Sequence, residues 1–160
     1  SIPYLYQTDA QWAESKYGDG KISDYGCGPT CMSMVYISLT GNKNLAPDAL
    51  GKFSEQNGFV EQGMTSWRFM SEGAELLGLN AAEIGANKDA IVSSLERGRP
   101  IICSVRPGDF TTVGHFIVLA GVNSDGSIDV RDPNSPDRSH KSWDADRILS
   151  QCNNLWAYSI

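Results

Sequence analysis

The amino-acid sequence predicts an α+β domain, in which helices come first along the chain and strands follow. Apolar residues recur with helical spacing in four segments between Pro29 and Leu95, whereas apolar runs typical of strands lie after residue 99. The dipeptide Asp125-Gly126 lies between two of these runs and indicates a hairpin. Because helices and strands do not alternate, a parallel βαβ sheet is not expected.

The helical part begins with an aromatic, Gly-rich segment, which is expected to be mostly irregular with a short helix around Asp9–Ser15. A long helix is expected from Pro29 to about Leu39, because proline fits a first turn and Gly41 ends the run. Three more helices are expected at Pro47–Gln56, at Thr65–Leu77 before Gly78, and from the N-cap Asn87 through Leu95 to Gly98.

The second part of the chain contains β-rich apolar runs separated by turn residues. The expected strands are Pro100–Val105, His115–Val122, Ser127–Asp132 and Asn154–Ile160. The run that begins at His115 is almost continuously apolar, which is typical of a strand buried on both faces of a sheet.

The chain has 160 residues, which fits one domain over residues 1–160 and suffices to bury a core without disulfides or a metal. Its 13 basic and 19 acidic residues give a net charge of −6, which argues against a nucleic acid or an anionic membrane as partner. No apolar stretch approaches the roughly 18 residues that a membrane-spanning helix needs. We therefore expect a globular domain with no membrane span.

The four cysteines are too sparse for a disulfide scaffold, and their spacing does not match a zinc ribbon. Cys27 lies between two glycines at the start of the first long helix, where the helix dipole favours a thiolate; the alternative is a small buried apolar residue. Cys31 lies one turn later on the same face and is the rival nucleophile, although its place inside the helix favours core packing. Cys103 is expected to be buried, and Cys152 to be free or paired with Cys31 or Cys103.

Two further residues are candidates to assist a thiolate. His115 opens the apolar strand, where the edge of an active site would lie; the alternative is a core histidine. Asp132 shares its face with the apolar Val130 by the period-two alternation, so it is expected to point inward, where its carboxylate needs a partner such as an imidazole N–H. The expected hairpin brings the His115 and Asp132 ends of its two strands together. His140 lies in a polar loop and is a poor candidate base.

A helix-start cysteine, a histidine and an orienting carboxylate are the parts of nucleophilic thiol catalysis. Such chemistry also needs donors for the oxyanion of the tetrahedral intermediate. The backbone N–H of Cys27 is one candidate. A side-chain amide upstream would be the second, and Gln7 and Gln11 are the candidates.

These residues, in this order, resemble the C39-like peptidases, which are papain-fold cysteine peptidases related to the leader-cleaving domains of bacteriocin exporters. The resemblance covers nearly the whole chain through the segments Pro3–Asp9, Gly26–Thr30, Gly114–Val118 and Asp132–Asn134. It implies a papain-like fold with a helical N-terminal half and a C-terminal antiparallel sheet.

The resemblance also implies a role for each matching residue. Cys27 would be the nucleophile, His115 the general base and acid, Asp132 the residue that orients the imidazole, and Gln7 the oxyanion donor. In the exporter domains this glutamine lies a few residues before the cysteine, whereas here 27 − 7 = 20 residues separate the two. The stretch Ala10–Gly26 is therefore interpreted as an insertion.

The resemblance thus implies a cysteine peptidase that hydrolyses peptide or isopeptide bonds through a Cys27 thioester, with a peptide or protein substrate and no cofactor, metal or obligate partner. The same residues would serve a papain-fold acyl transferase or a cell-wall amidase. The alternative from another class is a catalytically silent binding module. The resemblance, the acidic composition and the absence of an initiating Met favour a secreted or cell-surface bacterial protein over a cytoplasmic one.

Overall fold

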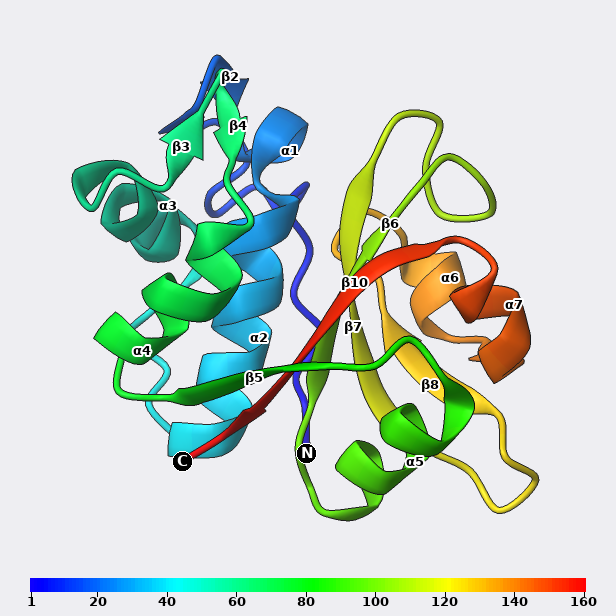
Figure 1. The fold of residues 1–160 in the computed structure, drawn as a ribbon. Coiled ribbons are helices and arrows are strands. Elements are labelled where there is room, and N and C mark those ends of the chain that lie inside the picture. The colour runs from blue at the N-terminus through cyan, green and yellow to red at the C-terminus, as the bar shows by residue number, and fades with distance from the viewer.

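The fold is given by a computed structural model that describes residues 1–160. A group of helices and a six-stranded antiparallel sheet lie side by side, and the chain passes from the first into the second (Figure 1). The predicted order of helices followed by an antiparallel sheet is therefore confirmed. No helix is both long enough and apolar enough to cross a membrane.

The helical half is built around one long central helix. Its elements are α1 (Ile22–Tyr25), α2 (Cys27–Thr40), α3 (Pro47–Gln56), the π-helix η1 (Phe69–Gly73) and α4 (Ala74–Leu76). The central helix α2 includes the predicted segment but begins earlier, at Cys27, and Gly41 ends it in the left-handed conformation with φ 74°. The bounds of α3 agree with the prediction.

Two of the helix predictions differ from the structure. Residues 9–15 form turns, because the carbonyls of Ala13 and Ser15 accept from the backbone N–H groups of α1 instead of continuing a helix. The predicted helix over residues 65–77 begins only at Phe69, because Thr65 pairs with Val60 in a hairpin. Apolar spacing alone does not reveal such competing hydrogen bonds.

Two small hairpins pack against each other above the start of α2 (Figure 1). One consists of β1 (Lys16–Tyr17) and β2 (Gly20–Lys21), and the other of β3 (Val60–Glu61) and β4 (Met64–Thr65). The N–H of Asp19 donates to the carbonyl of Gly63 at 3.1 Å, and a Cβ on Gly18 would lie 2.2 Å from that same oxygen. The contact therefore requires glycine at position 18. The stretch interpreted as an insertion forms the first hairpin and α1.

The sheet contains every strand that the sequence predicts, and two more. Its order is β5-β10-β6-β7-β8-β9, and all pairs are antiparallel. The strands are β5 (Asn80–Ile84), β6 (Ile101–Val105), β7 (His115–Val122), β8 (Ile128–Arg131), β9 (Ser142–Trp143) and β10 (Cys152–Ser159). The turn at Asp125-Gly126 joins β7 and β8, as predicted, with Gly126 at φ 88°.

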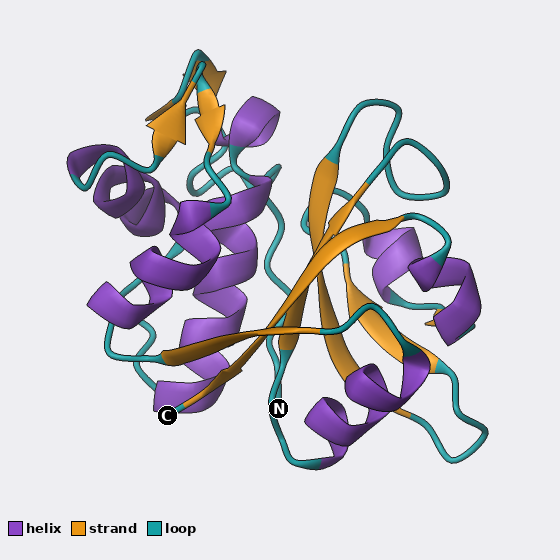
Figure 2. Ribbon diagram, in the orientation of Figure 1, coloured by secondary structure: helices purple, strands orange, loops and turns teal.

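Two apolar clusters of 15 buried residues each form the core, and the first of them joins the helical half to the sheet. The first fills the space between α2 and one face of the sheet, and the second lies on the other face under α5 (Lys88–Glu96) and α7 (Ala145–Leu149). Figure 2 shows helices on both sides of the sheet. Alternate residues of β6, β7 and β10 belong to one cluster or the other. These strands are therefore buried on both faces, which explains their continuous apolar sequence.

Candidate active site

A groove of about 820 Å³ runs between the helical half and the sheet. The helical half contributes Cys27 at the first position of α2, and the sheet contributes His115 at the first position of β7. Gln7 and Asn134 also line the groove. The groove thus places a thiol and an imidazole, which are 88 residues apart in the sequence (115 − 27 = 88), on facing walls.

The environment of Cys27 favours its thiolate. Burial would raise the pKa of the thiol, but a hydrogen bond and the charge of His115, together with backbone hydrogen bonds at Phe116 and Gly28, lower it. Gly28 also lets β4 approach closely, because a Cβ at this position would lie 2.9 Å from the side chain of Thr65. The sequence around Cys27 therefore serves both the thiol and the packing of the groove wall.

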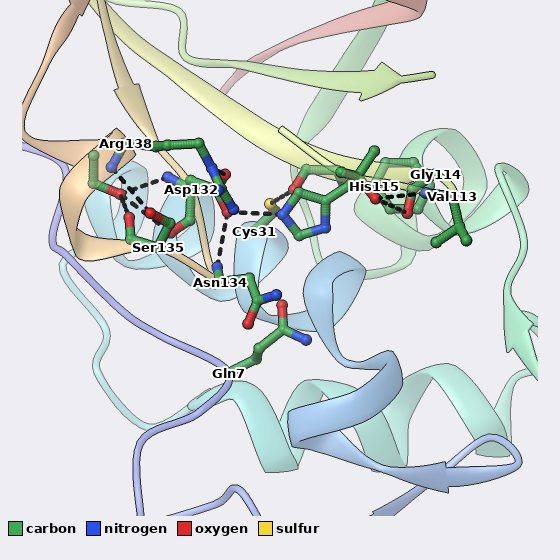
Figure 3. A network of polar contacts seen from close by, with 12 residues as sticks. Gln7, Cys31, Val113, Gly114, His115, Asp132, Asn134, Ser135 and Arg138 are labelled. Atoms are coloured by element: carbon green, nitrogen blue, oxygen red, sulfur yellow. Dashed lines mark hydrogen bonds and ion pairs between the residues drawn. The ribbon is translucent and has the colours of Figure 1, made fainter. Parts of the chain in front are cut away.

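The imidazole of His115 lies between the thiol and a carboxylate. Its Nε2 is 2.7 Å from Oδ1 of Asp132, so Nδ1 is the ring nitrogen left for Cys27 (Figure 3). Burial would lower the pKa of His115, but its bonds and charge interactions with Asp132 and Cys27 raise it to about 9. A lowered thiol pKa and a raised imidazole pKa both favour a thiolate–imidazolium pair over two neutral groups.

Asp132 is fully buried and is held by bonds from three directions. Oδ1 faces His115 and also accepts from the N–H of Asn134 at 2.8 Å, while Oδ2 accepts from Nε of Arg138 at 2.7 Å (Figure 3). Burial would raise the pKa of Asp132, but these donors lower it. Its own N–H donates to Oγ of Ser139 at 2.7 Å. The predicted inward orientation of Asp132 is thus confirmed.

The sequence reasoning missed Arg138, which comes from α6 (Pro136–Ser139). The hydroxyl of Ser135 accepts from the N–H of Arg138 and caps this short helix, and proline follows at its first position. The pair Ser135-Pro136 is a helix-start signal that could have been read from the sequence. This signal does not show that the side chain of Arg138 bonds to Asp132.

We expect Arg138→Ala to lower the free energy of unfolding by about 1–3 kcal/mol, because it removes a partner from a buried carboxylate. The pKa of Asp132 is lowered in the folded state, so the loss is full at neutral pH and shrinks as the pH falls through that lowered pKa. Urea unfolding of the wild type and the variant at several pH values measures this loss of stability.

Arg147→Ala is the matched control for this prediction. Arg147 makes a bidentate pair with Asp109, but its side chain is 64% exposed, so we expect a cost below about 1 kcal/mol. Equal costs for the two variants would contradict a special role of Arg138 in holding Asp132.

The structure separates the two glutamine candidates. Gln7 is buried in the groove wall, and its backbone N–H donates to the carbonyl of Pro133, the residue after Asp132, at 2.8 Å. Its Nε2 donates to the carbonyl of Ser23 at 3.1 Å and to the carbonyl of Ile22 at 3.5 Å, while its Oε1 has no partner. Gln11 is exposed, bonds to Asp9 and does not line the groove.

The other candidate thiol and the second histidine lie outside this arrangement. Cys31 is fully buried, its Sγ donates to the carbonyl of Phe116 at 3.4 Å, and burial raises the pKa of its thiol well above the usual value. His140 is exposed and stacks on Tyr4 with ring centroids 4.6 Å apart. The structure therefore brings together Cys27, His115 and Asp132, with Gln7 beside them, and neither Cys31 nor His140.

Comparison with known proteins supports the same fold. The Peptidase_C39 like family matches residues 1–159. The crystal structure of the peptidase domain of Streptococcus ComA, described as a bi-functional ABC transporter involved in a quorum-sensing pathway, matches with a TM-score of 0.63 and 20% identity. The match covers 85% of this chain and 92% of that domain, and it confirms the predicted papain-like α+β class. A search of curated proteins finds no significant match. Because the family match spans nearly the whole sequence, this chain belongs to the Peptidase_C39 like family, a cysteine peptidase family.

Proposed function

We propose that this protein is an active cysteine peptidase that hydrolyses peptide or isopeptide bonds through a thioester on Cys27. The observation that carries the proposal is the groove in which a helix-start thiol of lowered pKa faces His115, whose Nε2 is 2.7 Å from a buried carboxylate. A core histidine and a structural cysteine would not need to share a solvent-open groove.

The geometry supports a two-step reaction. The Cys27 thiolate attacks the substrate carbonyl, and the imidazolium of His115 gives its proton to the leaving amine as the carbon–nitrogen bond breaks. The imidazole then takes a proton from water, which attacks the thioester and frees Cys27. Asp132 fixes the ring with Nδ1 toward the thiol and stabilises the imidazolium that exists before the amine leaves.

The oxyanion would be held by the backbone N–H of Cys27 and the side-chain amide of Gln7. Both groups line the same groove, and the N–H of Cys27 also lies at the positive end of α2. The amide of Gln7 carries two N–H groups, and the carbonyl of Ser23 occupies one of them. The second N–H makes only a long bond of 3.5 Å to the carbonyl of Ile22, which a substrate oxygen would replace.

Alkylation of the wild-type protein with iodoacetamide at pH 6.5, followed by peptide mass spectrometry, tests the proposal first. We expect Cys27 to react at least about tenfold faster than Cys31, Cys103 or Cys152, because only its thiol has both a lowered pKa and access to the groove. Equal slow labelling of all four, or faster labelling of Cys31, would rule the assignment out.

A peptide library incubated in ¹⁸O-labelled water then separates the reactions that this site could perform. Cleaved products that carry one ¹⁸O in their new carboxylate indicate hydrolysis. Products joined to an added amine indicate acyl transfer. Fast alkylation of Cys27 with cleavage of cell-wall peptides alone would indicate an amidase, and the absence of any turnover would favour a binding module.

We expect Gln7→Ala to lower kcat by about 10²–10³-fold with little change in KM, because an oxyanion donor acts in the transition state and not on the bound substrate. Steady-state kinetics on a peptide from the library measures both constants. Gln11→Ala is the matched control and should leave them unchanged, because its side chain lies outside the groove. A fall confined to KM would argue against an oxyanion role for Gln7.

A further inference from the structure

Cys103 and Cys152 have no part in the proposed reaction, and their side chains meet beneath the groove wall. Sγ of Cys103 in β6 is 3.3 Å from Sγ of Cys152 in β10, and the Cys103 S–H donates to it. These strands are neighbours near the middle of the sheet (Figure 1). Both side chains belong to the same apolar cluster, whereas Cys31 belongs to the cluster on the opposite face. The sheet thus keeps Cys31 away from Cys152.

A β-bulge is what turns Cys152 toward Cys103. In the register of β6 and β10, Leu155 pairs with Cys103 and Asn154 with Ser104, but Cys152 then pairs with Val105 and leaves Asn153 unpaired. Without the extra residue, Cys152 would project from the other face of the sheet, because side chains alternate along a strand. The bulge therefore places the two thiols on one face.

Arg106 fixes the bulge in this conformation. Its Nη1 donates to the carbonyl of Cys152 at 2.7 Å and to Oδ1 of Asn153 at 3.1 Å, and its Nη2 donates to the carbonyl of Ser150 at 2.7 Å. One guanidinium thus ties the bulged residue Asn153 and, before it, Cys152 and Ser150 to the end of β6. A bulge held this firmly keeps the two sulfurs in contact.

We propose that Cys103 and Cys152 form an intramolecular disulfide when the protein meets a disulfide oxidant. A Cys152 thiolate attacks one sulfur of the oxidant, whose S–S bond breaks and whose first thiolate leaves with the electron pair. Cys103 then loses its proton, attacks the sulfur of Cys152 and releases the second thiol of the oxidant. Two protein thiols are oxidised, one disulfide is reduced to two thiols, and the two protons end on those thiols.

The order of the two steps follows from the surroundings of the sulfurs. The hydrogen bond from Cys103 and the charge of Arg106 lower the pKa of Cys152, although burial opposes this, and Cys152 retains slight exposure. The pKa of Cys103 is raised well above the usual value, because it donates that hydrogen bond and is buried. Cys152 is therefore the attacking thiol and Cys103 the resolving one. Formation of this disulfide does not require the proposed peptidase activity.

Mass spectrometry of the full chain tests the proposal, with Cys27→Ala as the background that removes the competing groove thiol. The reduced protein is treated with oxidised glutathione at neutral pH, and free thiols are then blocked with N-ethylmaleimide. We expect a loss of two hydrogen masses and one cross-linked peptide pair, containing Cys103 and Cys152. Cys103 and Cys152 both blocked by maleimide, or a link to Cys31, would overturn the proposal.

Two single variants separate a specific pair from general thiol reactivity. Cys103→Ser should stop at a glutathione adduct on Cys152, because the resolving thiol is missing, whereas Cys152→Ser should leave Cys103 unmodified. The opposite pattern would overturn the order of attack. With the wild-type sequence, the oxidised form should melt about 5–10 °C above the reduced form, since the link closes a loop between residues 49 apart. An equal or lower midpoint would show that the native structure does not accommodate the bond.

Discussion

Cys27→Ala is expected to lower peptide hydrolysis by about 10⁴-fold or more, to the level that binding and oxyanion contacts alone provide. The reason is that the proposed reaction proceeds through a bond to this sulfur, so no other group in the groove replaces it. Hydrolysis of a library-derived peptide, with trapping of the acyl-enzyme by acid quench and mass spectrometry, measures the loss. The thioester adduct should be present in the wild type and absent in the variant.

Cys31→Ala is the matched control, because it removes the other thiol on the same helix face. Cys31 lies under the carbonyl of Phe116 with no exposed surface, so its loss should cost stability, about 1 kcal/mol, and leave kcat/KM within about threefold of the wild type. A variant that loses activity while remaining folded would make Cys31 the nucleophile and contradict the proposed role of Cys27.

The sequence predicted the fold class and most of the elements because their signals are local. Helix α3, strand β7 and the cap at Asn87, whose side chain accepts from the N–H of Ala90, depend on residue type and spacing within a few residues. Strand β5 was missed because Asn80–Ile84 is Ala-rich and mostly exposed, so it has neither the composition nor the alternation of a strand. Its place at the sheet edge beside β10 is decided by tertiary pairing.

In the candidate site, too, features with a local sequence signal were predicted, and a contact decided by the tertiary structure, that of Arg138, was missed. Cys27 and His115 can be recognised from their local sequence, because one lies at a glycine-flanked helix start and the other is a polar ring at the start of an apolar strand. Contacts with segments that are distant in the sequence have no such local signal. Arg138 reaches Asp132 only because α6 turns back under β8, and Gln7 lies in the groove because its backbone bonds to Pro133. The long separation between Gln7 and Cys27 in sequence is absorbed by a hairpin and α1.

His115→Ala is expected to lower hydrolysis by about 10⁴-fold and to move the alkylation of Cys27 to higher pH. The two effects have different causes. Hydrolysis loses the group that protonates the leaving amine. Alkylation loses the charge that lowers the thiol pKa, and burial, which raises that pKa, is then no longer opposed by the imidazolium. At pH 7 only about 3% of an ordinary thiol is ionised, so iodoacetamide labelling of Cys27 should slow about tenfold or more in the variant. Rates measured from pH 5 to pH 10 give the shift.

The alkaline side of the pH–rate profile of hydrolysis tests whether Cys27 and His115 act as an ion pair. Because Asp132 and Cys27 raise the pKa of His115 to about 9, wild-type hydrolysis should be flat through neutral pH and fall as the imidazolium loses its proton near that value. Asp132→Asn removes the negative charge that supports the imidazolium, so this alkaline limb should move to lower pH while the variant stays folded. Arg147→Ala, which alters a carboxylate pair that does not contribute to the pKa of His115, should leave the limb in place. Neutral-pH labelling of Cys27 that survives in His115→Ala, or an alkaline limb that Asp132→Asn does not move, would mean that no ion pair exists at this site. The thiol would then be reactive through the end of α2 alone, and the carboxylate would serve only to hold the turn.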